Sequence, residues 1–438
     1  MNSLPKRIVL MAYILLCSIP VLCGQQETLW KTFPNKKHLD NGLTIICEKD
    51  GSSAITVVQI LIKGGKRAEP EGKQGLAYLT TRLVLEIPDQ TKLQEIMNQA
   101  THISMDCRND YSIINLECLS ENLEDTLKLM TDIMLKPVFS GTRIENIKKQ
   151  MNQRRKIEED DAVQAVHNYC LEIFFANTAY ADSVYGSQES LKSLKGKDIK
   201  NFYKDHFITG NMVVSVSSDL DEVIINRLFE KYFTKFLLGN PPEINPFSIT
   251  PTEEKNHFVE KETKQSLVAI AYPLPKISTR NFCLAFMLEN LLGKGVNSRL
   301  WPLRKKEKLA YNVNSKATQL KEAGILEVYL ETDNAKKDIA VDALKKVLRN
   351  LYENGISEEE LNSTKNFSQA SFLRNNERKE NRSHSLISFE ALGLGFNYLN
   401  RLFLEIDAVS LEEMNDYIKE VLDPEKGVEI IIGPQSTI

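Results

Sequence analysis

The strongest constraint on the fold of this chain is an internal repeat. Residues 194–218 (LKGKDIKNFYKDHFITGNMVVSVSS) align without gaps on residues 409–433 (VSLEEMNDYIKEVLDPEKGVEIIIG), and their apolar positions coincide although few residues are identical. Each copy has the pattern of a helix, a turn and a buried strand. A chain that repeats such a unit in both halves is expected to fold as two similar domains. Its 438 residues are also too many for one ordinary core.

The rest of each half shows strand patterns followed by groups of helical patterns. In the first half, residues 41–65 indicate two strands separated by a turn, residues 101–119 a hairpin around Asn109–Asp110, and residues 143–175 a long helical stretch. A strand, a helix, further strands and further helices recur in the second half. This order predicts an α+β fold with two duplicated domains, each a mostly antiparallel sheet with helices packed on one face.

The amino terminus has the pattern of a secretory leader. Lys6 and Arg7 precede the apolar run IVLMAYILLCSIPVLC, and no acidic residue occurs before Glu27. We therefore expect residues 1–24 to be a signal peptide and the protein to be exported, to the periplasm or out of the cell. An uncleaved membrane anchor is one alternative, although the run is short for a bilayer span. A lipidated Cys23 is another.

Composition divides the remaining chain and excludes several kinds of protein. Four prolines and no periodicity mark residues 238–256 as a linker between an N-terminal domain, residues 25–237, and a C-terminal domain, residues 257–438. A net charge of −4 gives no indication of nucleic-acid binding. The five cysteines outside the leader form no C-x-x-C motif and are expected to be buried. No two of the six histidines have the spacing of metal ligands.

Several segments, in their order and spacing, carry a resemblance that covers nearly the whole mature chain. They include IKGGKRAEPEGKQGLAYL, PVFSGTRIENIKKQM and ANTAYADSVYGSQESL in the first half, and LLGKGVNSRLWPLRKKEKLAYNVNS in the second. The chain resembles the inverted zinc peptidases of the pitrilysin and insulinase type. The branch similar in size contains the subunits of mitochondrial processing peptidase and the core proteins of the cytochrome bc1 complex. The resemblance implies that the two domains form half of a clamshell.

Active members of that family carry H-x-x-E-H on the first helix, where both histidines bind zinc and the glutamate serves as general base. The motif falls on Tyr78-Leu79-Thr80-Thr81-Arg82. Tyr78 is a poor ligand, Thr81 is no base near neutral pH, and Arg82 is permanently cationic. The family's third ligand, a glutamate on a later helix, aligns at about Arg154. The sequence therefore predicts that the zinc chemistry is lost and that this chain has no metal site of its own.

Other positions match residues that the family uses to hold a peptide. Arg304 and Tyr311, in LRKKEKLAY, have the family's seven-residue spacing, and on a helix both would point the same way. Arginine can bind a carbonyl or a carboxylate, and tyrosine can donate a hydrogen bond. The strand around Ser104 corresponds to the family's edge strand, to which a peptide adds by main-chain hydrogen bonds. A solvated basic helix and a plain edge strand are the alternative interpretations.

The resemblance therefore implies a non-catalytic, substrate-binding subunit of a heterodimeric zinc metallopeptidase. A zinc-bearing homologous partner would supply the metal and the base, and this chain would help to enclose and hold the peptide. On its own the chain is not expected to be an enzyme or to carry a cofactor. Two alternatives stay open, a structural subunit of the core-protein type and an autonomous peptide-binding protein. A membrane contact is expected only through an uncleaved leader.

Overall fold

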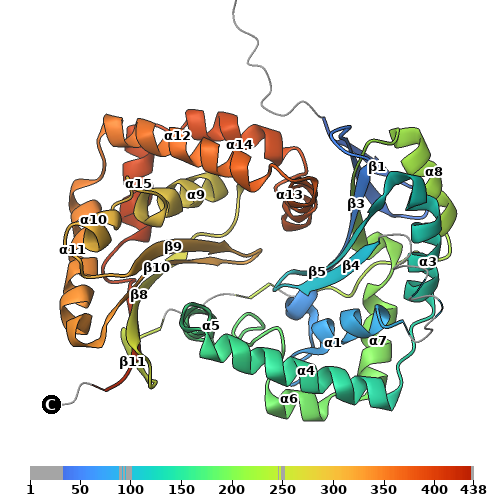
Figure 1. The fold of residues 1–438 in the computed structure, drawn as a ribbon, viewed down its shortest axis with the longest axis horizontal. Coiled ribbons are helices and arrows are strands. Elements are labelled where there is room, and N and C mark those ends of the chain that lie inside the picture. Colours follow the sequence, from blue (N-terminus) through green and yellow to red (C-terminus); the bar gives the residue numbers. More distant parts are fainter. Residues whose placement is uncertain are drawn as a thin grey trace, which may run out of the picture. The chain divides into compact units, whose positions relative to one another are not determined.

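The structure is a computed structural model that describes residues 33–87, 91, 94, 101–244, 246–247 and 252–435. The leader predicted over residues 1–24 lies outside the described residues. None of the helices in the described part combines the length and the apolar character needed to cross a bilayer. The described chain contains two β-sheets with packed helices, as expected for an α+β fold (Figure 1).

The first sheet has the strand order β1-β2-β6-β3-β5-β4. All neighbours are antiparallel except β2 and β6, which are parallel. The sequence correctly predicts the two strands after Gly42, where a positive φ of 83° permits the turn. These two strands do not pair with each other, because β6 lies between them. The strands are β1 (Asn35–His38), β2 (Thr44–Lys49), β3 (Ile55–Lys63), β4 (His102–Cys107), β5 (Tyr111–Leu119) and β6 (Met212–Ser218).

The second sheet repeats this topology and so confirms the duplication. Its order is β7-β11-β8-β10-β9, with β11 parallel to β7 and antiparallel to β8, as β6 is to β2 and β3. The first sheet carries β1 in addition. The strands are β7 (Asn256–Glu260), β8 (Gln265–Leu274), β9 (Asn312–Gln319), β10 (Gly324–Asp333) and β11 (Val428–Gly433). The domain boundaries at residues 237 and 257 stay a prediction.

Most helices follow one order in both halves, but no described helix after β11 corresponds to α8 (Glu222–Phe233), which follows β6. In the first half the helices are α1 (Leu76–Val84), α3 (Leu123–Leu135), α4 (Gly141–Asp160), α5 (Ala162–Phe174), α6 (Gln188–Ser193), α7 (Gly196–His206) and α8 (Glu222–Phe233). In the second they are α9 (Thr279–Gly293), α10 (Trp301–Lys305), α11 (Lys337–Asn354), α12 (Glu358–Asn375), α13 (Lys379–Leu392), α14 (Tyr398–Asp407) and α15 (Leu411–Val421). The predicted stretch 143–175 is two helices, because Asp161 has extended backbone and caps α5 by accepting the Gln164 N–H at 2.8 Å.

Two equivalent helices cross between the halves. Helices α3 and α8 cover one face of the first sheet with an apolar core, as predicted. The other face of β3 and β6 receives α13 from the second half (Figure 1). In return, α5 packs on β8, β10 and β11 of the second sheet. The central strands are therefore covered on both faces, which explains why β3 is a nearly continuous apolar run.

Candidate functional site

The first helix, α1, is placed by a glycine and a glutamate at its start. Gly75 has a φ of 92°, and a side chain there would come within 3.1 Å of the Tyr185 carbonyl oxygen. The Glu69 carboxylate accepts the backbone N–H of Gly75 at 3.0 Å and of Ala77 at 2.7 Å. These bonds satisfy donors that a helix start leaves open. Burial raises the pKa of Glu69 to about 8 in spite of both bonds.

Tyr78 occupies the first position of the family's motif and is 8% exposed. Its ring packs edge-on against Tyr185, with ring centroids 4.9 Å apart. Burial raises the pKa of the Tyr78 phenol, although the positive charges of Arg154 and Arg82 oppose the shift. The phenol therefore stays protonated at neutral pH, and a protonated phenol is a poor metal ligand.

The other two motif positions are occupied by side chains that bond within α1 or just beyond it. The Thr81 hydroxyl is buried and donates to the Ala77 carbonyl one turn earlier, at 2.9 Å. The Arg82 guanidinium forms an ion pair with Glu86, with Nη1 and Oε1 2.7 Å apart. Neither side chain has a free basic group that could take a proton from water.

Arg154, on α4, lies near Tyr78, as Arg82 does. The pKa of its guanidinium is raised, chiefly by the nearby Tyr78 and further by hydrogen bonding with the Tyr185 side chain. The structure thus brings Tyr78, Arg82 and Arg154 together, although Arg154 is 72 residues from Arg82 in the sequence (154 − 82). Its side chain is largely exposed.

These residues do not fit a zinc ion. Zinc in proteins is held by Cys, His, Asp or Glu, all of which offer a lone pair and most of which carry negative charge when bound. The corresponding positions here offer one protonated phenol, one hydroxyl and two guanidinium groups, which have no lone pair to give and repel a dication. The place instead carries Arg154, the Arg82–Glu86 ion pair and the Tyr78 hydroxyl, and we call it the cationic surface because Arg154 is left as an exposed cation suited to a carbonyl or carboxylate oxygen.

Ser104 lies on an edge strand, as the sequence predicts. Among the described strands, β4 has only β5 as a neighbour, so its other side presents free main-chain groups. Asn115 donates from Nδ2 to the Ser104 hydroxyl at 3.3 Å. Helix α1 packs beside this strand, so the edge and the cationic surface belong to one region of the first half.

Arg304 and Tyr311 do not lie on one helix, so the shared direction that a helical segment would give them does not apply. Helix α10 ends at Lys305, and Lys308 has a positive φ of 54° that no α-helix contains. The Arg304 guanidinium lies 5.1 Å from the centroid of the Trp301 ring. Tyr311 is 57% exposed, and its N–H donates to the Glu331 carbonyl at the start of β9. Both side chains reach solvent, and their peptide-holding role stays a prediction.

Two residues of the site have no signal in the sequence. Tyr185 and Glu69 lie in segments that carry the family resemblance, but no spacing relates either residue to α1. Their roles depend on tertiary contacts, the ring packing of Tyr185 on Tyr78 and the two hydrogen bonds of Glu69. The five cysteines outside the leader are buried and free, as expected.

Comparison with known proteins gives the family. Residues 44–188 match the family described as Insulinase (Peptidase family M16), and residues 193–367 match the Peptidase M16 inactive domain. The chain belongs to the M16 family of insulinase-type peptidases. The M16 chain is 25% identical over 382 residues to the "Non-peptidase homolog YmxG" of Helicobacter pylori, covering 86% of this chain and 88% of that protein.

Two further likenesses extend over most of the M16 chain. It is 22% identical over 353 residues to subunit beta of the mitochondrial-processing peptidase of Rattus norvegicus, covering 76% of this chain and 71% of that protein. The crystal structure of a peptidase M16 inactive domain from Pseudomonas fluorescens has a TM-score of 0.84 at 17% identity, covering 92% of this chain and 98% of that one. The fold is therefore the M16 two-domain fold. Relatives include a non-peptidase and a subunit of a larger assembly, and a non-catalytic role fits the residues of α1.

Proposed function

We propose that this M16 chain is the non-catalytic, peptide-binding subunit of a heterodimeric zinc metallopeptidase. The observation that carries the proposal is the replacement of all ligand and base positions on α1 and α4 within an otherwise intact M16 fold. Zinc and the general base belong to a homologous partner chain with an intact H-x-x-E-H. With the predicted leader, both chains act outside the cytoplasm.

The edge strand and the cationic surface support a role in holding peptides. A peptide that pairs with β4 makes main-chain hydrogen bonds that need little side-chain identity, so such a site accepts many sequences. Arg154 and the tyrosine hydroxyls beside it suit a carbonyl or carboxylate of that peptide. Arg304 and Tyr311 provide a second set of exposed donors in the second half.

Reconstitution with a candidate partner tests the proposal. The M16 chain, a homologue from the same genome that carries an intact motif, and their mixture are assayed for cleavage of fluorogenic peptides. We expect the mixture to be clearly more active than the partner alone, and the excess to be lost when a chelator removes zinc. Equal activity of partner and mixture, together with no co-elution on size exclusion, contradicts the proposal.

Variants of this chain then separate peptide binding from assembly. Arg304→Ala with Tyr311→Phe, and separately Arg154→Ala, are expected to raise KM in the mixture about tenfold, as when hydrogen bonds to a charged group are removed. Arg227→Ala, an exposed arginine on α8 away from these residues, is the matched control. A subunit with a purely structural role predicts unchanged kinetics in all three variants.

A further inference from the structure

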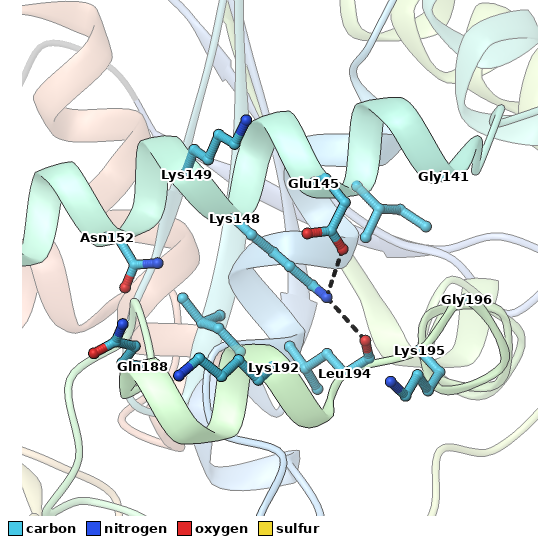
Figure 2. A pocket seen from close by; sticks show the side chains of 12 residues that line it. Gly141, Glu145, Lys148, Lys149, Asn152, Gln188, Lys192, Leu194, Lys195 and Gly196 are labelled. Carbon is cyan, nitrogen blue, oxygen red and sulfur yellow. Dashed lines mark hydrogen bonds and ion pairs between the residues drawn. The ribbon is translucent and has the colours of Figure 1, made fainter.

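A second surface of the first half, away from the altered motif positions, has the properties of a binding groove, although its floor packs in the same apolar cluster as α1. It lies between α4 and α6 and extends to the start of α7, with a volume of about 500 Å³ (Figure 2). Its floor is apolar and buried, and its sides are polar. The floor consists of Ile144, Leu191 and Leu194, which are 6%, 2% and 1% exposed.

The charge of this groove differs from that of the chain as a whole. Four lysines and one glutamate line it, although the protein carries a net charge of −4. Lys148 is fixed, because its ammonium donates to Glu145 Oε1 at 3.0 Å and to the Leu194 carbonyl at 3.0 Å. Glu145 is thereby neutralised, and the excess positive charge belongs to the remaining three lysines.

These three lysines, Lys149, Lys192 and Lys195, are exposed and form no ion pair with any described carboxylate. Figure 2 shows Lys192 on α6 and Lys195 in the segment before α7, whereas Lys149 comes from α4 and its side chain extends from the side of that helix turned away from α6. The amides of Asn152 and Gln188 lie together at one end, where they can serve main-chain groups of a ligand.

We propose that this groove, here called the basic groove, binds an acidic polypeptide segment. An apolar side chain of that segment covers the floor, and its carboxylates lie at the rim lysines. The lysines are spread around the rim and do not converge on one point, which suits carboxylates spaced along a chain better than a single phosphate group. Charge complementarity of this kind mainly sets the rate and specificity of association.

The basic groove is separate from the altered zinc position, and the proposal does not depend on the proposed function. Both surfaces use α4, but Lys148 and Arg154 are six residues apart and so point about 120° from each other around the helix axis. The Arg154 side faces Tyr78, whereas Lys148 faces Leu194. Loss of one surface should leave the other intact.

The test measures binding of a labelled peptide to the full chain by fluorescence anisotropy at low ionic strength. The probe alternates glutamate and leucine, and a matched peptide carries lysine in place of glutamate. The groove variant is Lys149→Glu/Lys192→Glu/Lys195→Glu. The control variant, Lys197→Glu/Lys200→Glu/Lys204→Glu, makes the same charge change at exposed positions of α7 that do not line the groove.

We expect the acidic probe to bind wild type and control alike and the groove variant about tenfold or more weakly, since three exposed ion pairs are each replaced by a repulsion. The lysine probe should not bind. Equal affinity of the groove and control variants for the acidic probe overturns the proposal. Failure of the wild-type protein to bind the acidic probe also overturns it. Groove-dependent binding of pyrophosphate without binding of the acidic probe also overturns it, because it identifies a small-anion site.

Discussion

The equivalent helices α5 and α13 cross to the opposite half in the same way but pack there through different chemistry. Helix α5 contributes Ala165, Val166, Leu171 and Phe174 to an apolar cluster on the second sheet. On α13, Arg382 forms buried ion pairs with Glu48 and Asp50 of the first half. Apolar contacts are non-directional, whereas these bonds fix one arrangement. Helix α5 therefore stabilises its contact mainly by burying apolar surface, whereas the ion pairs of α13 also fix how that helix lies on the first sheet.

A second cationic side chain on α13 strengthens the contrast. The Lys379 ammonium, also on α13, donates to the carbonyls of Asp50, Ser53 and Ile55 at 2.8, 2.9 and 3.0 Å. The turn between β2 and β3 is thus held by side chains from more than three hundred residues away in the sequence. Helix α5 also makes a polar contact with the second sheet, a hydrogen bond between His167 Nδ1 and Glu327 Oε2 that are 2.9 Å apart.

The largest expected effect on stability comes from removing the guanidinium of Arg382, which lies at the centre of the contact between α13 and the first half. Arg382→Ala leaves Glu48 and Asp50 buried without their guanidinium and should lower the free energy of unfolding by about 3–5 kcal/mol. Urea unfolding measures the change. Arg378→Ala, at the start of α13 with a side chain 73% exposed, is the control and should cost less than about 0.5 kcal/mol. Equal losses in both variants contradict the account.

A somewhat smaller loss is expected from the α5 contact. Leu171→Ala removes a side chain that is 7% exposed and should cost about 2–4 kcal/mol through lost burial and a residual cavity. Glu172→Ala, exposed on the same helix, should be nearly neutral. The loss in Leu171→Ala should be insensitive to salt. A loss that falls strongly with added salt would show that α5 also packs mainly by charge.

How far the sequence predicts this fold depends on whether a feature is local. The repeat is visible because α7 and α15 each begin two residues into the aligned segments, at Gly196 and Leu411. Asp161 also has a local signal, since aspartate is a common N-cap, and the break between α4 and α5 could have been predicted from it. The crossing of α5 and α13 could not, because an apolar strand shows that both faces are covered but not by which helix.

The residues of the candidate site also differ in whether a local sequence signal predicts them. The altered motif on α1 is contiguous and can be read from five residues, Tyr78 to Arg82. The packing of Tyr185 on Tyr78 depends on the loop before α6, which no spacing in the sequence relates to α1. Arg304 at the end of α10 and Tyr311 before β9 are separated by Lys308, which adopts a left-handed conformation although it carries no special signal in the sequence.

The smallest expected effect is on the pH dependence of the unfolding free energy, and it comes from His384 on α13. Burial lowers the pKa of His384 from 6.5, and the charge of Arg108 adds to this in spite of Asp106 and Glu380. The folded state therefore keeps the imidazole neutral, so its contribution to stability is present above the unfolded pKa near 6.5 and is lost as pH falls. Between about pH 7 and pH 5, His384→Gln should reduce the fall in unfolding free energy by about 1 kcal/mol or less. An unchanged pH dependence contradicts the assignment.

The most direct test of the account is the zinc content of this chain alone. The purified full chain is loaded with zinc, dialysed and measured by mass spectrometry for metal, and then assayed for peptide cleavage with and without a chelator. An M16 peptidase with an intact H-x-x-E-H, handled in parallel, shows that the procedure retains a bound metal. The account predicts far less than one zinc per chain and no chelator-sensitive cleavage. About one zinc per chain, with cleavage that a chelator abolishes, would contradict it.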